Sequence, residues 1–148
     1  MVFRLENDLG FLLARTHRAM RRWLMSHLEP LNITYEQFRV LNALCDRDRV
    51  SQVNLADRVN ADTTSLARML DRMESAGLIT REAKPADSRV NLVTLTENGR
   101  RIMRLLIPER DRALHTALQT LNEKEVRELK RLLNSIYREI GSFAPEKR

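Results

Sequence analysis

The sequence predicts a mainly α-helical (α+β) chain with one small β-hairpin, organised as a winged helix-turn-helix. Apolar residues recur at helical spacing through residues 51–75, where a short helix, a turn and a second helix form a helix-turn-helix. Residues 78–82 and 90–95 are short and rich in β-branched side chains, which is typical of the two strands of a hairpin. A hairpin directly behind a helix-turn-helix is a wing.

Composition excludes several classes of protein. The 148 residues are 43% hydrophobic and 31% charged, and no apolar run reaches the roughly 18 residues that a membrane span needs. Glu6 and Asp8 stand where a signal peptide would be basic or apolar. The single cysteine, Cys45, cannot form an internal disulfide. We therefore expect a cytoplasmic protein with no membrane contact, and the formal net charge of +6 suits a polyanionic partner.

Two helices are expected before the helix-turn-helix. The first spans residues 5–28 and stops before Pro30. The second follows Thr34, which forms a capping-box pattern with Gln37. The residues that it should bury are Phe38, Leu41 and Leu44.

Within the helix-turn-helix, Ser51 should cap the short helix, and Gly77 should end the longer one in a left-handed conformation. The residues expected to face the core are Val53, Leu55, Ala56, Val59, Leu66, Met69, Leu70 and Met73. The hairpin loop, residues 83–89, contains the turn formers Pro85 and Asp87 and is predicted to be too long for a tight turn.

Two helices are expected after the hairpin. Thr96 caps a long helix that Pro108 should kink, because proline removes one backbone hydrogen bond. Asn122 and Glu125 begin the last helix. Its apolar residues are Val126, Leu129, Leu132, Leu133, Ile136, Ile140 and Phe143. The terminal helices have broad apolar faces that a second copy of the chain would cover, although packing within one chain is the alternative.

Catalytic motifs are missing from the sequence. His17, His27 and His115 are scattered, and the glycines are isolated, so no metalloprotease, nucleophile-elbow or phosphate-loop pattern is present. We therefore expect no enzyme, no cofactor and no metal site.

The outer face of the second helix of the helix-turn-helix favours DNA binding. Thr63, Thr64 and Ser65 place small hydroxyl groups in its first turn, and Arg68 and Arg72 follow on the same side. Small hydroxyl groups at a helix N-terminus can approach phosphates and base edges, and arginine can bind guanine. A capped helix that faces only solvent would show the same pattern, so this alternative stays open.

The hairpin and its surroundings resemble the multiple antibiotic resistance regulator (MarR) family. The stretch Asp87-Ser88-Arg89, five residues and Leu95-Thr96 matches the wing signature of that family, and residues 68–79 resemble its Arg-Leu-x-Asp-x-Leu-Glu-x-x-Gly-Leu-Ile pattern. The resemblance implies a homodimeric winged-helix transcriptional regulator that binds double-stranded DNA. It places Arg89 in a minor groove, with Asp87 bracing the wing through an ion pair to an arginine such as Arg72. Lys84 on the hairpin is a further candidate contact to DNA.

Many members of this family bind small phenolic or aromatic effectors beside the dimer-forming helices. The candidate residues for such a pocket are His17, Met20, Arg21, Trp23 and Phe38, although methionine and tryptophan at helical spacing also suit a core. Other members sense oxidants through a cysteine near the start of the first helix. Cys45 departs from that pattern, and we expect it to be a buried packing residue.

The sequence therefore predicts one domain, 1–148, with a DNA-binding lobe at 34–95 and a dimerisation lobe formed by 5–29 and 96–143. The expected function is that of a sequence-specific regulator, in particular a repressor that a small ligand releases from a pseudo-palindromic operator. Two alternatives remain: an architectural DNA-binding protein with little sequence preference, and a winged-helix module that binds other proteins.

Overall fold

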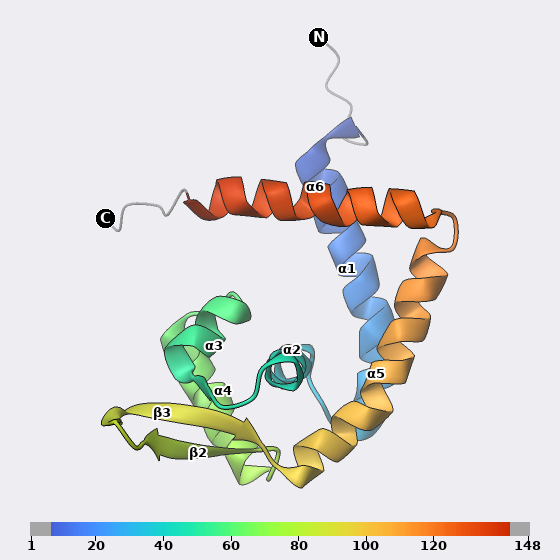
Figure 1. The fold of residues 1–148 in the computed structure, drawn as a ribbon. Helices are drawn as coiled ribbons and strands as arrows, with labels where there is room; N and C mark the ends of the chain where they lie inside the picture. The colour runs from blue at the N-terminus through green and yellow to red at the C-terminus, as the bar shows by residue number, and fades with distance from the viewer. Residues whose placement is uncertain (1–6, 143–148) are drawn as a thin grey trace. The chain divides into compact units, whose positions relative to one another are not determined.

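The computed structural model describes residues 7–142, apart from the side chains of His27 and Ser142, and confirms the mainly helical winged-helix fold (Figure 1). The chain forms two compact units, Met1–Asp111 and Arg112–Arg148. None of the described helices is long and apolar enough to cross a membrane.

The N-terminal helices are α1 (Leu9–Leu28), the short 3-10 helix η2 (Glu29–Leu31) and α2 (Tyr35–Asp46). Asp8 caps α1 by accepting a 2.7 Å hydrogen bond from the Phe11 N–H, and the predicted start at residue 5 lies outside the described residues. The capping box before α2 is confirmed. The Thr34 hydroxyl accepts from the Gln37 N–H at 3.1 Å, and the Gln37 side chain accepts from the Thr34 N–H at 2.9 Å.

The helix-turn-helix consists of α3 (Gln52–Arg58) and α4 (Thr63–Ser75). Ser51 caps α3 as predicted, and Gly77 has the predicted left-handed conformation, with φ +65°. Val53, however, is 61% exposed, so its assignment to the core was wrong. Successive residues of a helix are about 100° apart, so Val53 and Leu55 lie on nearly opposite sides of α3. Leu55, Ala56 and Val59 are buried instead.

The wing is a three-stranded antiparallel sheet in the order β1-β3-β2, formed by β1 (Val50–Ser51), β2 (Ile79–Lys84) and β3 (Asp87–Leu95). The sequence analysis missed β1, because alternation cannot be recognised in two residues. The predicted long loop was also wrong. Lys84 pairs with Asp87, so only two residues, Pro85 and Ala86, connect the strands.

One hydrophobic core joins α2, α3, α4, the wing and the first half of α5 (Glu97–Leu118). Its fully buried members include Leu41, Leu44, Leu55, Leu66, Leu70, Met73, Val93 and Met103, whereas Met69 is only partly buried at its edge. No polar or charged residue in the described part of the chain is buried. The core therefore fixes α4 and the base of the wing against each other.

The start of α5 packs closely against the turn before β2. Thr96 caps this helix as predicted, because its hydroxyl accepts a 3.0 Å hydrogen bond from the Gly99 N–H. A Cβ atom at Gly99 would lie 2.2 Å from the Leu78 carbonyl oxygen, so only glycine fits there. The helix continues through Pro108.

The last helix is α6 (Glu123–Ser142), and none of its residues 123–141 is buried. Asn122 and Glu125 form the predicted N-terminal cap. Its large exposed hydrophobic side chains are Leu129, Leu132, Leu133, Tyr137 and Ile140. Phe143 lies outside the described residues.

Candidate nucleic-acid interface

The exposed face of α4 carries the candidate residues of the helix-turn-helix. Asp62 caps the helix by accepting a 2.8 Å hydrogen bond from the Ser65 N–H, and this bond holds the pKa of the Asp62 carboxyl below its usual value. Leu66, Leu70 and Met73 anchor the opposite face in the core. At about 100° per residue, four exposed polar side chains share one side of α4, whereas Thr63 is exposed at its N-terminal end away from them. The four are Thr64, Ser65, Arg68 and Arg72.

Arg68 and Arg72 line a shallow hollow on α4 together with Ser65 and Asp71. The Asp71 carboxylate is engaged by Arg81 of β2 at 2.7 Å. Within residues 7–142, no ion pair joins Arg68 or Arg72 to an acidic side chain, so both guanidinium groups can bind an external anion or a base edge.

Arg81 is the residue that ties the wing to α4, and the sequence analysis missed it. Its guanidinium binds the Glu74 carboxylate through Nε at 2.9 Å and Nη2 at 2.7 Å, and its N–H also donates to Glu74 at 2.9 Å. These hydrogen bonds, with Asp71 in addition, raise the pKa of Arg81 above its ordinary value. The i, i+3 spacing of Asp71 and Glu74 was the available signal, because it places two carboxylates on one side of α4.

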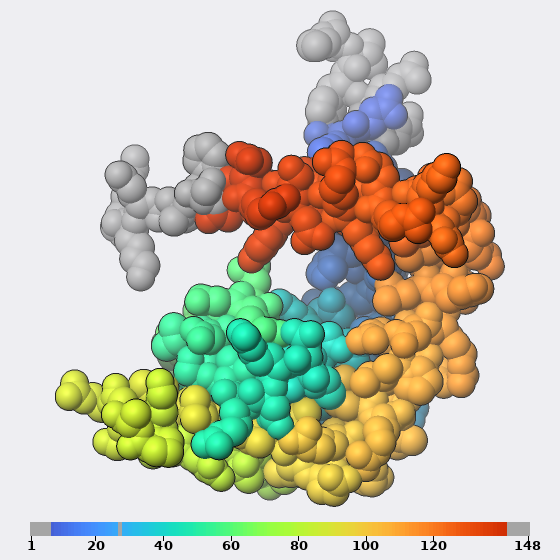
Figure 2. Space-filling view, viewed as in Figure 1, coloured from blue at the N-terminus to red at the C-terminus, as the bar shows by residue number. Residues whose placement is uncertain are grey.

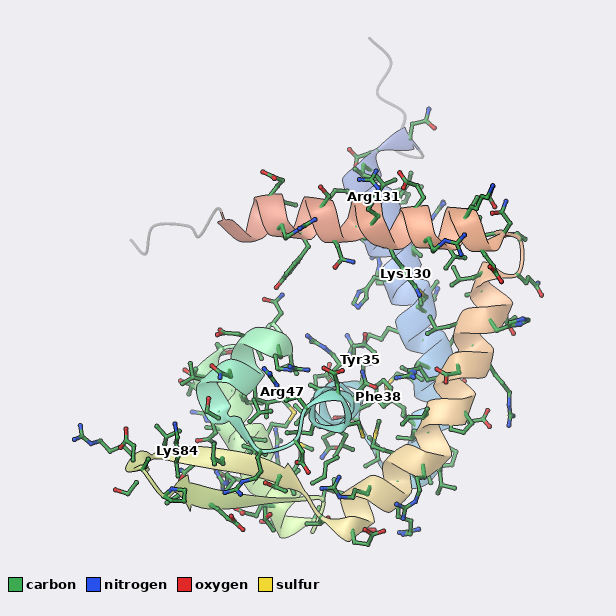
Figure 3. All side chains as sticks on the ribbon, in the orientation of Figure 1. Tyr35, Phe38, Arg47, Lys84, Lys130 and Arg131 are labelled. Atoms are coloured by element: carbon green, nitrogen blue, oxygen red, sulfur yellow. The ribbon has the colours of Figure 1, made fainter. Side chains whose placement is uncertain are left out.

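The tip of the wing exposes Arg89 almost completely, with 95% of its side chain accessible. The predicted ion pair between Asp87 and Arg72 is not formed. Asp87 instead accepts a 3.1 Å hydrogen bond from the Arg89 N–H and lies 3.9 Å from the Arg89 Nε. The two-residue turn explains the difference, because Asp87 begins β3 at the far end of the hairpin. Lys84, labelled in Figure 3, is exposed directly across the turn.

Asp48 connects the loop after α2 with the wing and α5. Its Oδ1 accepts hydrogen bonds from the Arg49 N–H at 3.0 Å and the Leu95 N–H at 3.2 Å, and its Oδ2 binds Arg100. Burial alone would raise the pKa of this carboxyl, but the bonds from Arg100, Leu95 and Arg49 together lower it. Asp48 therefore stays ionised and holds the base of the wing.

A separate open pocket of about 700 Å³ lies among α2, α3 and α5. Its lining includes Tyr35, Phe38, Arg39, Asn42, Cys45, Arg58, Ile107 and Arg110. The Arg110 guanidinium donates a 2.7 Å hydrogen bond to the Asn42 side chain across this space. Arg58 is paired with Asp46, which also lines the pocket, and Arg110 is paired with Asp111. Arg39 has no ion pair within the described residues, so it is the arginine best suited to an organic anion beside the aromatic and aliphatic walls.

The five candidate effector residues do not all reach this pocket. Phe38 lines it, and Tyr35 connects it to two others: His17 Nε2 lies 3.3 Å from the Tyr35 hydroxyl, and Arg21 stacks 5.0 Å from the Tyr35 ring. Met20 and Trp23 lie on an exposed apolar face of α1 instead.

Cys45 is exposed at the same pocket, so the expectation that it is buried was wrong. It lies in the last turn of α2, which borders the pocket rather than the core. Among residues 7–142, no three histidine, cysteine or acidic side chains are grouped so that they could hold a metal ion.

Comparisons with known proteins agree with this fold. The MarR family model matches residues 33–90. The chain is 33% identical to the organic hydroperoxide resistance transcriptional regulator of Bacillus subtilis over 90% of this chain and 88% of that protein. CouR from Rhodococcus jostii, solved with p-coumaroyl-CoA bound, superposes with a TM-score of 0.83 at 26% identity, over 91% of this chain and 95% of CouR. A mutant of MarR from E. coli, solved with operator DNA, gives a TM-score of 0.80 at 31% identity, over 92% and 98% of the two chains.

Proposed function

This chain belongs to the MarR family and is a transcriptional regulator, and we propose that it is a ligand-responsive repressor that binds a pseudo-palindromic operator as a homodimer. The observation that carries the proposal is the exposed face of α4, where two arginines without an ion pair in the described chain follow a hydroxyl-rich first turn. The structural similarity to an E. coli MarR mutant solved with operator DNA supports it.

In this proposal α4 enters the major groove and the wing enters the next minor groove. Arg68 and Arg72 contact base edges and phosphates, while Thr63, Thr64 and Ser65 approach the backbone. Arg89, with Lys84 nearby, enters the minor groove, where the phosphates on both sides attract its charge. Asp87 orients the backbone of Arg89 and does not touch DNA itself. Residues 34–95 thus form the DNA-binding lobe.

The dimer is proposed from the exposed apolar faces of the terminal helices. Leu9, Leu13, Met20 and Trp23 share one face of α1, and Leu129, Leu133 and Ile140 share one face of α6. Monomeric proteins rarely expose apolar patches of this extent. We therefore propose residues 5–29 and 96–143 as the dimerisation lobe. A two-fold axis would place the operator half-sites about one helical turn apart.

The pocket among α2, α3 and α5 is the proposed effector site, and an aromatic organic anion is the proposed effector. Phe38 and Ile107 offer apolar walls, and Arg39, which has no ion pair within the described residues, supplies positive charge. CouR, which was solved with p-coumaroyl-CoA, shows that a similar fold holds an aromatic anionic ligand. His17 and Arg21 act through their contacts with Tyr35, whereas Met20 and Trp23 lie outside the pocket on the proposed dimer face of α1. An effector of this kind and a DNA target both suit a cytoplasmic regulator.

Selection of bound duplexes from a random DNA pool tests the proposal. We expect a recurring pseudo-palindrome that binds roughly a thousandfold or more tightly than scrambled DNA. Similar affinity for every duplex would favour an architectural protein, and no salt-dependent binding at all would favour a module that contacts other proteins. Aromatic carboxylates and CoA thioesters added to the complex should then release the operator.

A further inference from the structure

A basic hollow lies between the wing and the start of α3, and the proposed function assigns a role to only one of its residues, Lys84. Residues from three segments line it: Arg47, Arg49, Ser51, Asn54, Lys84 and Leu92. Arg47 and Lys84 are labelled in Figure 3, and Figure 2 shows the yellow wing against the green atoms of α3.

The charges in this hollow do not cancel. Its two acids are Asp48 and Asp57, and Asp48 is engaged by Arg100. Arg58 also lines the hollow but is paired with Asp46. Within the described part of the chain, no ion pair involves Arg47, Arg49 or Lys84. The hollow therefore presents three cations against one acid.

The backbone of the loop is held in a conformation that arginine seldom adopts. Arg49 has φ +53°, in the left-handed region, whereas the other non-glycine residues found there in the described chain are Asn32 and Asn60. Asp48 fixes this conformation by accepting a 3.0 Å hydrogen bond from the Arg49 N–H while it also binds Leu95 and Arg100. Non-glycine residues in this region cluster at functional sites. The loop thus holds Arg47 and Arg49 beside the wing in a fixed geometry.

We propose that the basic hollow binds one phosphate backbone strand of DNA, with Arg47 and Arg49 as the residues that contact the phosphates. A major groove and the neighbouring minor groove are separated by a single backbone strand. If α4 occupies the first groove and Arg89 the second, that strand must cross the protein between the helix-turn-helix and the wing. The basic hollow lies between α3 and the hairpin, and its excess positive charge suits phosphate. This inference rests on the proposed function.

The test is the salt dependence of binding by the double variant Arg47→Gln/Arg49→Asn. Asparagine is chosen at position 49 because it tolerates the left-handed conformation. Each lost phosphate contact should flatten the plot of log K against log salt by about 0.9, so two contacts give about 1.8. Affinity at ~0.15 M salt should fall roughly fivefold for each contact. The loss should be equal on the operator and on a scrambled duplex of the same length, because the backbone carries no sequence information.

The matched control is Arg18→Gln/Arg22→Gln on α1, which removes two charges from exposed arginines of the same compact unit. Its salt slope should match that of the wild type. Arg47→Lys should keep most of the slope, because a phosphate contact depends mainly on charge. If Arg49→Asn lowers the melting temperature, the single variant Arg47→Gln is measured instead. Its plot of log K against log salt should be flatter than that of the wild type by about 0.9, the value for one phosphate contact.

Two results would overturn the inference while leaving the proposed function intact. One is a slope for Arg47→Gln/Arg49→Asn equal to that of the control, and the other is a loss confined to the operator, which would make the arginines base readers. A wild-type protein that bound no duplex would refute the proposed function itself, and the inference with it.

Discussion

Arg68 and Arg89 carry the same charge, but they lie on different elements and should contribute to DNA binding in different ways. Arg68 lies on the exposed face of α4, where a bidentate contact with guanine distinguishes base pairs. Arg68→Ala should therefore cost about 1–3 kcal/mol on the operator and relax the base preference at one position in each half-site. Binding to a panel of single-base operator variants measures this change.

The companion variant, Arg89→Ala, should lower the binding affinity for operator DNA and for scrambled DNA by similar factors. The guanidinium at the wing tip is exposed, and the minor groove that it would enter in the proposed complex distinguishes little more than A·T from G·C pairs. Arg89→Lys should recover only part of the loss, because an ammonium is more strongly hydrated than a guanidinium. Wild-type affinity of Arg89→Ala at ~0.15 M salt would contradict a DNA-binding role for the wing tip.

The Cys45 thiol should react slowly despite its exposure. Partial burial raises its pKa, and the nearby Asp48 carboxylate adds to this effect, while Arg100 opposes it. A raised pKa lowers the thiolate fraction at neutral pH, and the thiolate is the reactive form. Alkylation by iodoacetamide at pH 7.5 should thus be slower than for a free cysteine peptide, and the gap should narrow above pH ~9.

The same chemistry gives an expectation for regulation by oxidants. Cys45→Ser should bind the operator like the wild type, with or without mild peroxide. The similar Bacillus subtilis regulator is named for organic hydroperoxide resistance, but this chain has no cysteine in α1. Peroxide-triggered release that disappears in Cys45→Ser would refute the expectation.

At the scale of elements, Arg81 should couple the wing to α4. Its side chain is only 22% exposed and binds two carboxylates of α4. Arg81→Ala should destabilise the fold by about 1–2 kcal/mol, because charged hydrogen bonds to Glu74 and Asp71 are lost. Urea denaturation measures this loss. Arg104→Ala removes an exposed pair with Glu97, and such surface pairs add little to stability, so its urea midpoint should stay close to that of the wild type. Equal destabilisation in both variants would argue against this coupling.

Sequence patterns predicted those elements whose signal is local. The capping box at Thr34, the cap at Ser51 and the left-handed Gly77 depend on residues within a few positions of each other, and all are confirmed. What could not be predicted depends on contacts between distant segments. The β1 strand exists only through its pairing with β3. Glycine is required at position 99 only because any Cβ atom there would collide with the carbonyl oxygen of Leu78.

The candidate site likewise combines features that the sequence predicted with contacts between distant residues that it could not predict. Helical spacing predicts that Arg68 and Arg72 lie opposite the core-facing residues of α4, and both are exposed. The sequence could not show that Asp71 forms an ion pair with Arg81. Nor could it show that Asp87 accepts a hydrogen bond from the Arg89 N–H instead of pairing with Arg72. Nor could it place Asp48, whose partners Leu95 and Arg100 follow 47 and 52 residues later in the chain.

At the scale of the whole molecule, the exposed apolar faces should make the protein an obligate dimer. Leu133 is 40% exposed and Ile140 is 64% exposed on one side of α6. Burying such side chains against a second copy stabilises the assembly by roughly 25 cal/mol for each Å² of apolar surface removed from water. A carboxylate in that interface would lose its hydration without gaining a partner.

Leu133→Glu/Ile140→Glu should therefore dissociate the dimer, and sedimentation velocity at micromolar concentration measures the change. Arg131→Glu is the matched control, because residue 131 lies on the opposite side of α6 from positions 133 and 140 at about 100° per residue. It should leave the dimer intact. A dissociated protein should also lose most operator affinity, since each protomer then contacts a single half-site. A wild-type protein that sediments as a folded monomer at micromolar concentration would refute the dimer, and with it the expected two-fold symmetry of the operator.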